Sequence, residues 1–187
     1  MSSIESTYTE ANPKSQAEFE RTRRSMPGVA KGAYYFQPFP LTMARGDGCY
    51  LEDIDGHRYV DFAGHHTAQV LGHGHPAVLE AVQKQMAAGI ATAAPMGVEA
   101  DLAEEICRRV ASVDLVRFCN SGTEASLHAI RLARVFSGKP KVAKFEGGYH
   151  GSHDGVEISV APVPDKSGPV DVPLPVATAG GLAPHAM

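Results

Sequence analysis

The chain has 187 residues, of which 43% are hydrophobic and 20% charged, a composition typical of a soluble globular domain. Its 17 basic and 21 acidic residues give a net charge of −4, and no cluster of lysine and arginine is dense enough to predict nucleic-acid binding. The sequence shows no signal peptide and no apolar run of transmembrane length. We therefore expect a cytoplasmic protein with neither nucleic acid nor membrane as a partner.

The cysteines predict neither disulfides nor a zinc site. Cys49, Cys107 and Cys119 are odd in number and lie far apart in the sequence. We expect buried thiols in a reducing compartment, which agrees with a cytoplasmic location.

The first third of the chain contains three predicted features. Residues 1–12 are polar and are expected to be loosely held, and a short helix is predicted over residues 15–21. The aromatic stretch 32–40 contains two prolines, which is typical of an extended segment. Alternation around the Asp55-Gly56 turn signal predicts a β-hairpin over residues 48–62.

The loop that follows, residues 64–76, is rich in histidine. It holds four of the nine histidines: His65, His66, His73 and His75. Imidazole is a common metal ligand, but the loop offers no carboxylate or cysteine beside these rings. The pattern therefore does not favour a metal site, and we predict none.

Regular structure is also predicted in three other segments. Amphipathic patterns predict helices over 76–86, with proline in the first turn, and over 98–110. A small-residue loop, 89–95, joins them. A strand is expected over 156–160, and the Pro-, Gly- and Ala-rich stretch 162–187 is expected to be irregular.

The centre of the chain reads as strand, turn and helix. Val116 and Phe118 predict a short strand, residues 120–122 a tight turn, and apolar residues at helical spacing a helix to Phe136. A second strand is predicted over 141–146. A right-handed crossover would lay the two strands parallel, so that both end at one edge of a sheet.

The turn at the start of this helix contains three residues that can approach an anion: Ser121, Gly122 and Thr123. Free N–H groups and the positive end of the helix dipole favour a phosphate there. The alternative is a capping box, formed by Ser121 with Glu124, which needs no ligand. The second predicted strand leads to Tyr149 and His150 on a glycine-rich loop, at the edge where open α/β sheets bind ligands. A phosphate cradle beside an aromatic ring suits a planar phosphorylated cofactor such as pyridoxal phosphate.

Two motifs in this region resemble class III aminotransferases, especially the branch that contains glutamate-1-semialdehyde aminomutase and β-amino-acid aminotransferases. They are Asn120-Ser121-Gly122-Thr123-Glu124-Ala125 and Phe145-Glu146-Gly147-Gly148-Tyr149-His150-Gly151. The resemblance extends to residues 39–62 and to Leu71-Gly72-His73-Gly74-His75-Pro76, and so covers most of the chain from about residue 26.

The resemblance implies an α/β fold, that of the aspartate-aminotransferase-like enzymes that use pyridoxal phosphate. Residues 1–66 would form an N-terminal segment with a helix and a hairpin. Residues 67–187 would form the first part of the large cofactor-binding domain.

The resemblance also implies a function, the transfer of an amino group between an amino acid or amine and a carbonyl acceptor. Pyridoxal 5′-phosphate would be the cofactor, and the residues that contact it would be Ser121, Gly122, Thr123, Tyr149 and His150. The partners would be a small-molecule amino donor and a keto acceptor, and the full-length parent would be a homodimer.

The substrate pocket is expected to include His66, which aligns where relatives place pocket residues. Lys31 is a second candidate, since it could pair with a carboxylate; it could equally be a surface charge. Segment 29–34 lacks the serine and arginine that aminomutases carry, and His66 stands where they carry tryptophan. Because Pro38-Phe39-Pro40-Leu41 resembles β-amino-acid aminotransferases, that reaction is favoured over the aminomutase reaction.

The catalytic residues of the family have no counterpart in this sequence. Relatives carry a Schiff-base lysine and an acidic partner of the pyridine nitrogen beyond the Tyr-His-Gly loop. No lysine of this chain has a matching context. We therefore expect an N-terminal fragment that is inactive alone.

Three alternatives stay open. The chain could be a non-catalytic fragment that binds a partner chain or a phosphate ligand, or its parent could be an aminomutase. An ordinary nucleotide-binding α/β protein ranks last, because no G-x-G-x-x-G or G-x-x-x-x-G-K-[ST] loop is present.

Overall fold

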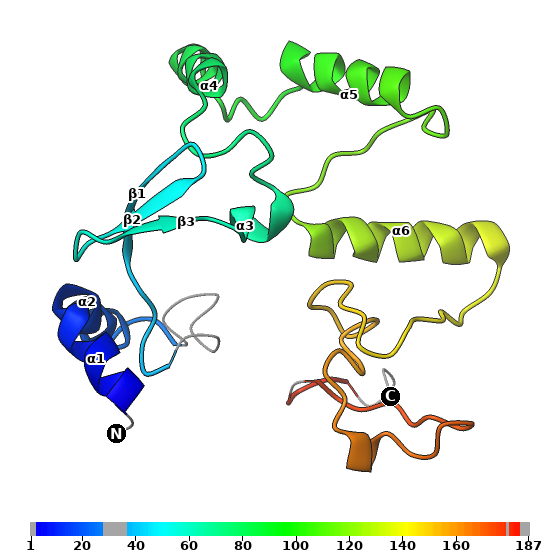
Figure 1. Cartoon of the computed structure of the whole chain (residues 1–187). Coiled ribbons are helices and arrows are strands. Elements are labelled where there is room, and N and C mark those ends of the chain that lie inside the picture. Colours follow the sequence, from blue (N-terminus) through cyan, green and yellow to red (C-terminus); the bar gives the residue numbers. More distant parts are fainter. Residues whose placement is uncertain (1–2, 28–36, 179, 184–187) are drawn as a thin grey trace. The chain divides into compact units, whose positions relative to one another are not determined.

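The computed structural model describes residues 3–27, 37–178 and 180–183 (Figure 1). The chain divides into two compact units, Met1–Ala94 and Pro95–Met187. Lys31 and most of the predicted extended segment 32–40 lie outside the described residues. Across the described ranges, no helix combines the length and the apolar character needed to cross a bilayer.

The first unit is built on a three-stranded antiparallel sheet in the order β1-β2-β3 (Figure 1). Its strands are β1 (Met43–Asp47), β2 (Tyr50–Asp53) and β3 (Arg58–Val60). The predicted hairpin is confirmed as β2 and β3, in which Leu51 lies opposite Tyr59. The sequence pattern did not reveal β1, which pairs with the other edge of β2.

Two helices precede the sheet, α1 (Ser3–Ala11) and α2 (Pro13–Thr22). Helix α2 confirms the predicted short helix, but the expectation that residues 1–12 are loosely held is wrong. Helix α1 is anchored by Tyr8, whose hydroxyl donates to the carbonyl of Phe39 over 2.7 Å. The two rings lie 5.0 Å apart, and Phe39 is only 3% exposed. This long-range contact, which a polar sequence pattern does not reveal, holds the segment.

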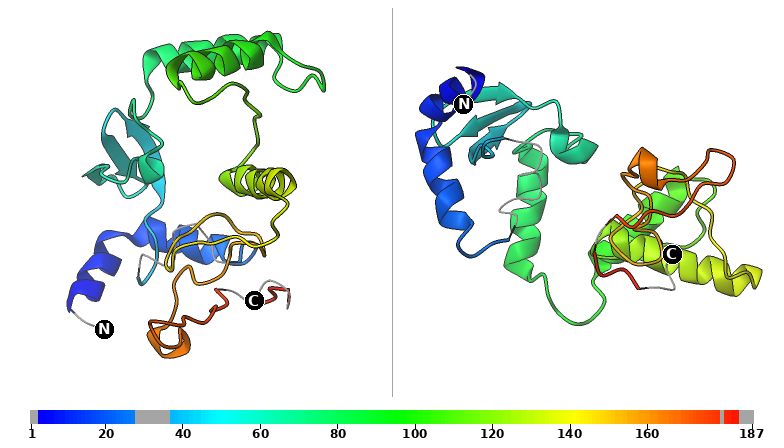
Figure 2. Two further views of the ribbon diagram at one scale, coloured as in Figure 1. Left: turned by 90° about the vertical axis from the view of Figure 1, so that its right-hand side faces the viewer. Right: turned by 90° about the horizontal axis from the view of Figure 1, so that it is seen from below.

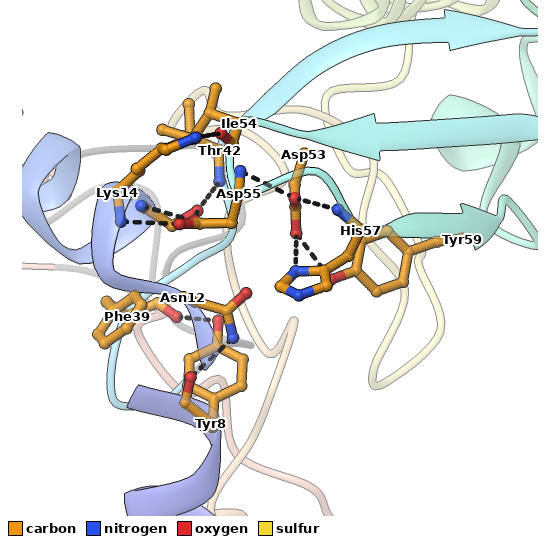
Figure 3. Close-up of polar contacts among 11 residues, drawn as sticks. Tyr8, Asn12, Lys14, Phe39, Thr42, Asp53, Ile54, Asp55, His57 and Tyr59 are labelled. Atoms are coloured by element: carbon orange, nitrogen blue, oxygen red, sulfur yellow. Dashed lines mark hydrogen bonds and ion pairs between the residues drawn. The ribbon is translucent and has the colours of Figure 1, made fainter. Parts of the chain in front are cut away.

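Asp55 of the β2–β3 turn joins the sheet to α2 (Figure 3). Asp55 accepts hydrogen bonds from the backbone N–H groups of Lys14 and Ser15, over 2.8 and 2.9 Å. A carboxylate at a helix N-terminus satisfies free donors and opposes the helix dipole. The β2–β3 turn therefore fixes the start of α2.

Asp53 lies at the centre of this junction and is 1% exposed (Figure 3). It accepts hydrogen bonds from the Tyr59 hydroxyl at 2.7 Å and from the backbone N–H of His57 at 2.8 Å. Burial raises the pKa of Asp53, but the hydrogen bonds from Tyr59 and His57 outweigh it, so the pKa lies below its ordinary value. Burial, followed by the bond to Asp53, raises the pKa of Tyr59.

The first unit ends with two helical elements, α3 (Gly64–Thr67) and α4 (Pro76–Ala88). Helix α4 confirms the predicted helix, with proline at its first position. Element α3 is a single turn, inside which His65 and His66 have left-handed backbone angles.

The second unit contains the helices α5 (Gly97–Arg109) and α6 (Gly122–Ser137) and a short 3-10 helix, η2 (Pro164–Lys166). Both predicted helices are confirmed. Helix α6 ends where Gly138 takes a left-handed conformation with φ 67°, the usual helix stop. Figures 1 and 2 show the chain after α6 returning beside that helix in irregular loops.

The prediction of three strands in this unit is wrong, because none of the three segments forms a regular strand. Residues 116–118 and 141–146 form no strand, and the expected strand over 156–160 is reduced to one bridge between Ile158 and Ala177. A strand persists only where a neighbour takes up its N–H and C=O groups. Among the described residues these segments find no such neighbour, so the predicted parallel pair does not form.

Replacement of Asp53 by asparagine is expected to destabilise the first unit. The amide would present N–H groups where the Tyr59 hydroxyl and His57 need an acceptor, and disrupting such a buried bond costs about 1–3 kcal/mol. Urea unfolding followed by circular dichroism would measure the change. Glu52→Gln is the matched control: Glu52 pairs with Arg45 on the exposed side of the same strand, so a much smaller change is expected. Equal effects would contradict the assignment.

Stability is also expected to fall in acid. The folded pKa of Asp53 is lowered from its unfolded value of about 3.9. Its contribution to stability is therefore complete above the unfolded pKa and is lost as the pH falls through the folded pKa. Urea midpoints between about pH 7 and pH 3 should decline, and less steeply in Asp53→Asn. Parallel declines in the two proteins would show that Asp53 does not carry the effect.

Candidate functional site

The first turn of α6 forms the predicted capping box and still has backbone N–H groups without an acceptor among the described residues. Ser121 is the N-cap residue, and its Oγ accepts a hydrogen bond from the backbone N–H of Glu124 over 3.2 Å. The Glu124 carboxylate reaches back to the N–H of Asn120 over 2.7 Å. In the part of the chain that the structure describes, the N–H groups of Gly122 and Thr123 have no acceptor. The cap and an anion site are therefore compatible.

The loop that carries Tyr149 lies directly against this turn. Gly151 is buried, with φ 111°, and a Cβ built on it would lie 2.9 Å from Cα of Thr123. The N–H of Ser152 donates to Oγ1 of Thr123 over 3.1 Å. Only glycine permits this approach, because a side chain at residue 151 would collide with the helix.

A second pair of side chains continues the contact one turn along α6. Ser126 donates to the carbonyl of Thr123 over 3.0 Å, and its Oγ lies 3.4 Å from Nε2 of His153. Sequence reasoning missed Gly151, Ser126, Ser152 and His153 as supports of the site. The one available signal was the glycine that ends the Tyr-His-Gly motif.

Tyr149 and His150 lie on the surface of this loop. Tyr149 is 61% exposed, and its hydroxyl lies 3.0 Å from Oγ of Ser152. His150 is also exposed, with Nε2 turned back to 2.9 Å from the position of a Cβ on Gly148. The docking of the loop thus brings the predicted cofactor-binding residues of the turn and the loop into one region, without the strands that were expected to do so.

Of the two predicted substrate residues, His66 and Lys31, the structure describes only His66. His66 belongs to the first unit and has left-handed backbone, with φ 55°. Its imidazole is exposed, and its ring centre lies 6.4 Å from that of His65. Lys31 lies outside the described residues. Within the described ranges, no three side chains of His, Cys, Asp or Glu are grouped to hold a metal ion.

A cavity of about 770 Å³ lies along the flank of α6. Its lining is partly apolar, with Leu127, Ile130 and Val142, and partly charged, with Arg131 and Arg134. It shares Ser152 and His153 with the loop contact, but Ser121, Gly122, Thr123 and Tyr149 do not line it. The cavity therefore does not coincide with the turn predicted to bind an anion.

The residues present fit the phosphate and the ring of a pyridoxal phosphate molecule. In the described part of the chain, the N–H groups of Gly122 and Thr123 are unpaired, and a Cβ built on Gly122 would have no atom within 4 Å, so this part does not crowd the Cα of Gly122. An exposed aromatic ring lies on the docked loop. Lys144 is occupied elsewhere, because its Nζ donates to the carbonyls of Ile158 at 2.6 Å and Phe145 at 3.1 Å.

Comparison with known proteins identifies the family. The class-III aminotransferase family model matches residues 33–165. Glutamate-1-semialdehyde 2,1-aminomutase from Methanothermobacter thermautotrophicus is 44% identical over 84% of this chain and 39% of its own length. β-Phenylalanine transaminase from Variovorax paradoxus is 46% identical over 77% of this chain and 33% of its own length. The chain thus spans well under half the length of these relatives.

Solved structures agree. An ω-transaminase from Sphaerobacter thermophilus has a TM-score of 0.85 and 41% identity, over 92% of this chain and 39% of that one. A transaminase with PLP bound has a TM-score of 0.80 and 34% identity, over 90% of this chain and 38% of that one. These likenesses point to pyridoxal 5′-phosphate as the cofactor and confirm the predicted fold over the part that the chain spans. The chain belongs to the class-III aminotransferase family, whose fold is that of the fold type I enzymes dependent on pyridoxal phosphate.

Proposed function

We propose that this chain supplies the phosphate-binding turn and the ring-stacking loop of an enzyme that uses pyridoxal 5′-phosphate to move an amino group between an amino acid or amine and a carbonyl acceptor. The observation that carries the proposal is the packing of Gly151 against Thr123. It joins a helix N-terminus with unpaired donors to a loop with an exposed aromatic ring.

Two hydroxyl groups at the turn would add donors for a phosphate. Oγ of Ser121 accepts from the N–H of Glu124, and Oγ1 of Thr123 accepts from the N–H of Ser152. Each oxygen thus uses acceptor capacity within the protein and keeps its own proton for an external acceptor. With the N–H groups of Gly122 and Thr123, the turn offers four donors to a dianionic phosphate.

Tyr149 would stack on the pyridine ring, with His150 beside it. Offset stacking of aromatic rings contributes about 0.5–1.5 kcal/mol beyond the area that it buries. The bond between the Tyr149 hydroxyl and Ser152 fixes the ring on the docked loop. When bound, the cofactor supplies the electron sink that stabilises negative charge beside the transferred nitrogen.

The favoured substrates are a β-amino acid as amino donor and a keto acceptor, with His66 and Lys31 in the pocket for the substrate carboxylate. Support comes from Pro38-Phe39-Pro40-Leu41 and from a β-phenylalanine transaminase that is 46% identical. Aminomutase activity is the second candidate, supported by an aminomutase that is 44% identical over 84% of this chain. The assembly would be a homodimer, in which residues 1–66 and 67–187 form the N-terminal segment and the first part of the large domain.

Thr123→Val is expected to weaken the binding of pyridoxal phosphate by roughly 10- to 150-fold, because a hydrogen bond to a charged group contributes about 1.5–3 kcal/mol. Equilibrium dialysis of the purified chain measures the affinity. Thr123→Ser is the control, since it keeps both the acceptor for Ser152 and the proton for phosphate. Unchanged affinity in the valine variant would leave Thr123 with a docking role alone.

Tyr149→Ala is expected to lower the same affinity by roughly 2- to 12-fold, the equivalent of one ring stack. Tyr149→Phe keeps the ring and removes only the hydroxyl bonded to Ser152. It should therefore bind nearly as well as the unmodified chain. Similar losses in both variants would show that the hydroxyl matters rather than the ring, and the stacking role would be wrong.

A further inference from the structure

Asp61, just after β3, joins two segments of the histidine-rich loop. Its Oδ1 accepts hydrogen bonds from the backbone N–H groups of Ala63 at 3.0 Å and Gly64 at 2.9 Å. Its Oδ2 lies 2.7 Å from Nε2 of His73. The Asp61 side chain is 8% exposed and that of His73 19%, so solvent competes little for this pair.

His73 is held in place from its other sides. Its backbone exchanges two hydrogen bonds with Gly48, of 2.9 and 2.8 Å, which fixes it to the β1–β2 turn. Its ring packs on Gly46, where a Cβ would lie only 2.5 Å from the ring carbon Cγ. The amide nitrogen of Gln69 lies 3.4 Å from Nδ1, and this contact directs an Nε2–H donor toward Asp61.

The segment between these anchors has an unusual backbone. His65, His66 and Thr67 follow one another with φ of 50°, 55° and 71°. Residues with a Cβ rarely adopt this conformation, and such strain persists only where surrounding contacts impose it. Of the backbone bonds that close the turn, one runs from Thr67 to Ala63 over 3.0 Å and another from Gln69 to Gly64 over 2.9 Å. Both acceptors belong to residues whose N–H groups Asp61 binds.

We propose that Asp61 and His73 form a clasp that imposes the left-handed turn and thereby positions the imidazole of His66. Asp61 and His73 are positioning residues: neither is assigned to substrate or cofactor. The consequence for catalysis rests on the proposed function, in which His66 lines the substrate pocket. The clasp itself does not depend on the proposed function.

The test uses the full chain labelled with ¹⁵N, without cofactor. In Asp61→Asn the new amide places N–H groups against the Nε2–H of His73, which should open the clasp. We expect the amides of Thr67 and Gln69 to exchange at least about tenfold faster. The imidazole resonances of His66 should shift, while the amides of β2 and β3 keep their exchange rates. Asp47→Asn, an exposed carboxylate on β1 of the same sheet, should change none of these.

Two further variants separate the clasp from a general structural role. His73→Gln keeps a side-chain N–H close to the position of Nε2, so the His66 resonances should stay as in the unmodified chain. In His73→Ala they should shift. Gly46→Ala should displace the His73 ring and reproduce Asp61→Asn without changing any hydrogen-bonding group. The proposal is overturned if Asp61→Asn leaves exchange and the His66 resonances unchanged, if exchange rises equally throughout the sheet, or if His73→Gln behaves like His73→Ala. Failure of cofactor binding would instead count against the proposed function alone.

Discussion

The contact between Gly151 and Thr123 is the constraint on which the candidate cofactor site depends. A Cβ at residue 151 would lie 2.9 Å from Cα of Thr123, closer than side-chain atoms approach in folded proteins. Because the loop is so close, its next N–H reaches Oγ1 of Thr123, and Tyr149 is held beside the start of α6. One missing side chain thus determines whether the first turn of α6 and the aromatic ring lie in one region.

Carboxylates organise the first unit in a comparable way. Asp53 and Asp61 accept hydrogen bonds from backbone N–H groups at turns, and Asp55 accepts one at the start of α2. In each case a short acidic side chain replaces the acceptor that regular structure would provide. The pKa of Asp61 is lowered by the hydrogen bond from His73 and by those from the backbone, as expected for a carboxylate that is bound in its charged form.

Structural elements whose signals lie in residues close together in the sequence could be predicted. The helical spacing before Phe136, the proline at residue 76 and the Asp55-Gly56 turn signal each led to an element that the structure contains. The strands around residues 116–118 and 141–146 could not be predicted reliably, because a strand depends on a partner that its own residues do not specify. Likewise, Tyr8 holds α1 through Phe39, a residue far along the chain.

The residues of the candidate site could likewise be predicted only in part. Ser121, Gly122 and Thr123 were recognisable because a helix N-terminus has a local sequence signature. The supports of that site, Ser126 and His153, come together only when the loop folds back, so no spacing rule reveals them. The clasp between Asp61 and His73 likewise joins residues on opposite sides of a loop.

The most direct test of the account is a ¹H–¹⁵N titration of the labelled chain with pyridoxal 5′-phosphate, beside a parallel titration with pyridoxal. The account predicts that the phosphorylated compound shifts the amides of Gly122 and Thr123 together with those of Tyr149 and His150. Pyridoxal, which lacks the phosphate, should leave the first two unmoved. Shifts that are absent from Gly122 and Thr123, or identical for the two compounds, would contradict the assignment of the α6 turn as the phosphate site.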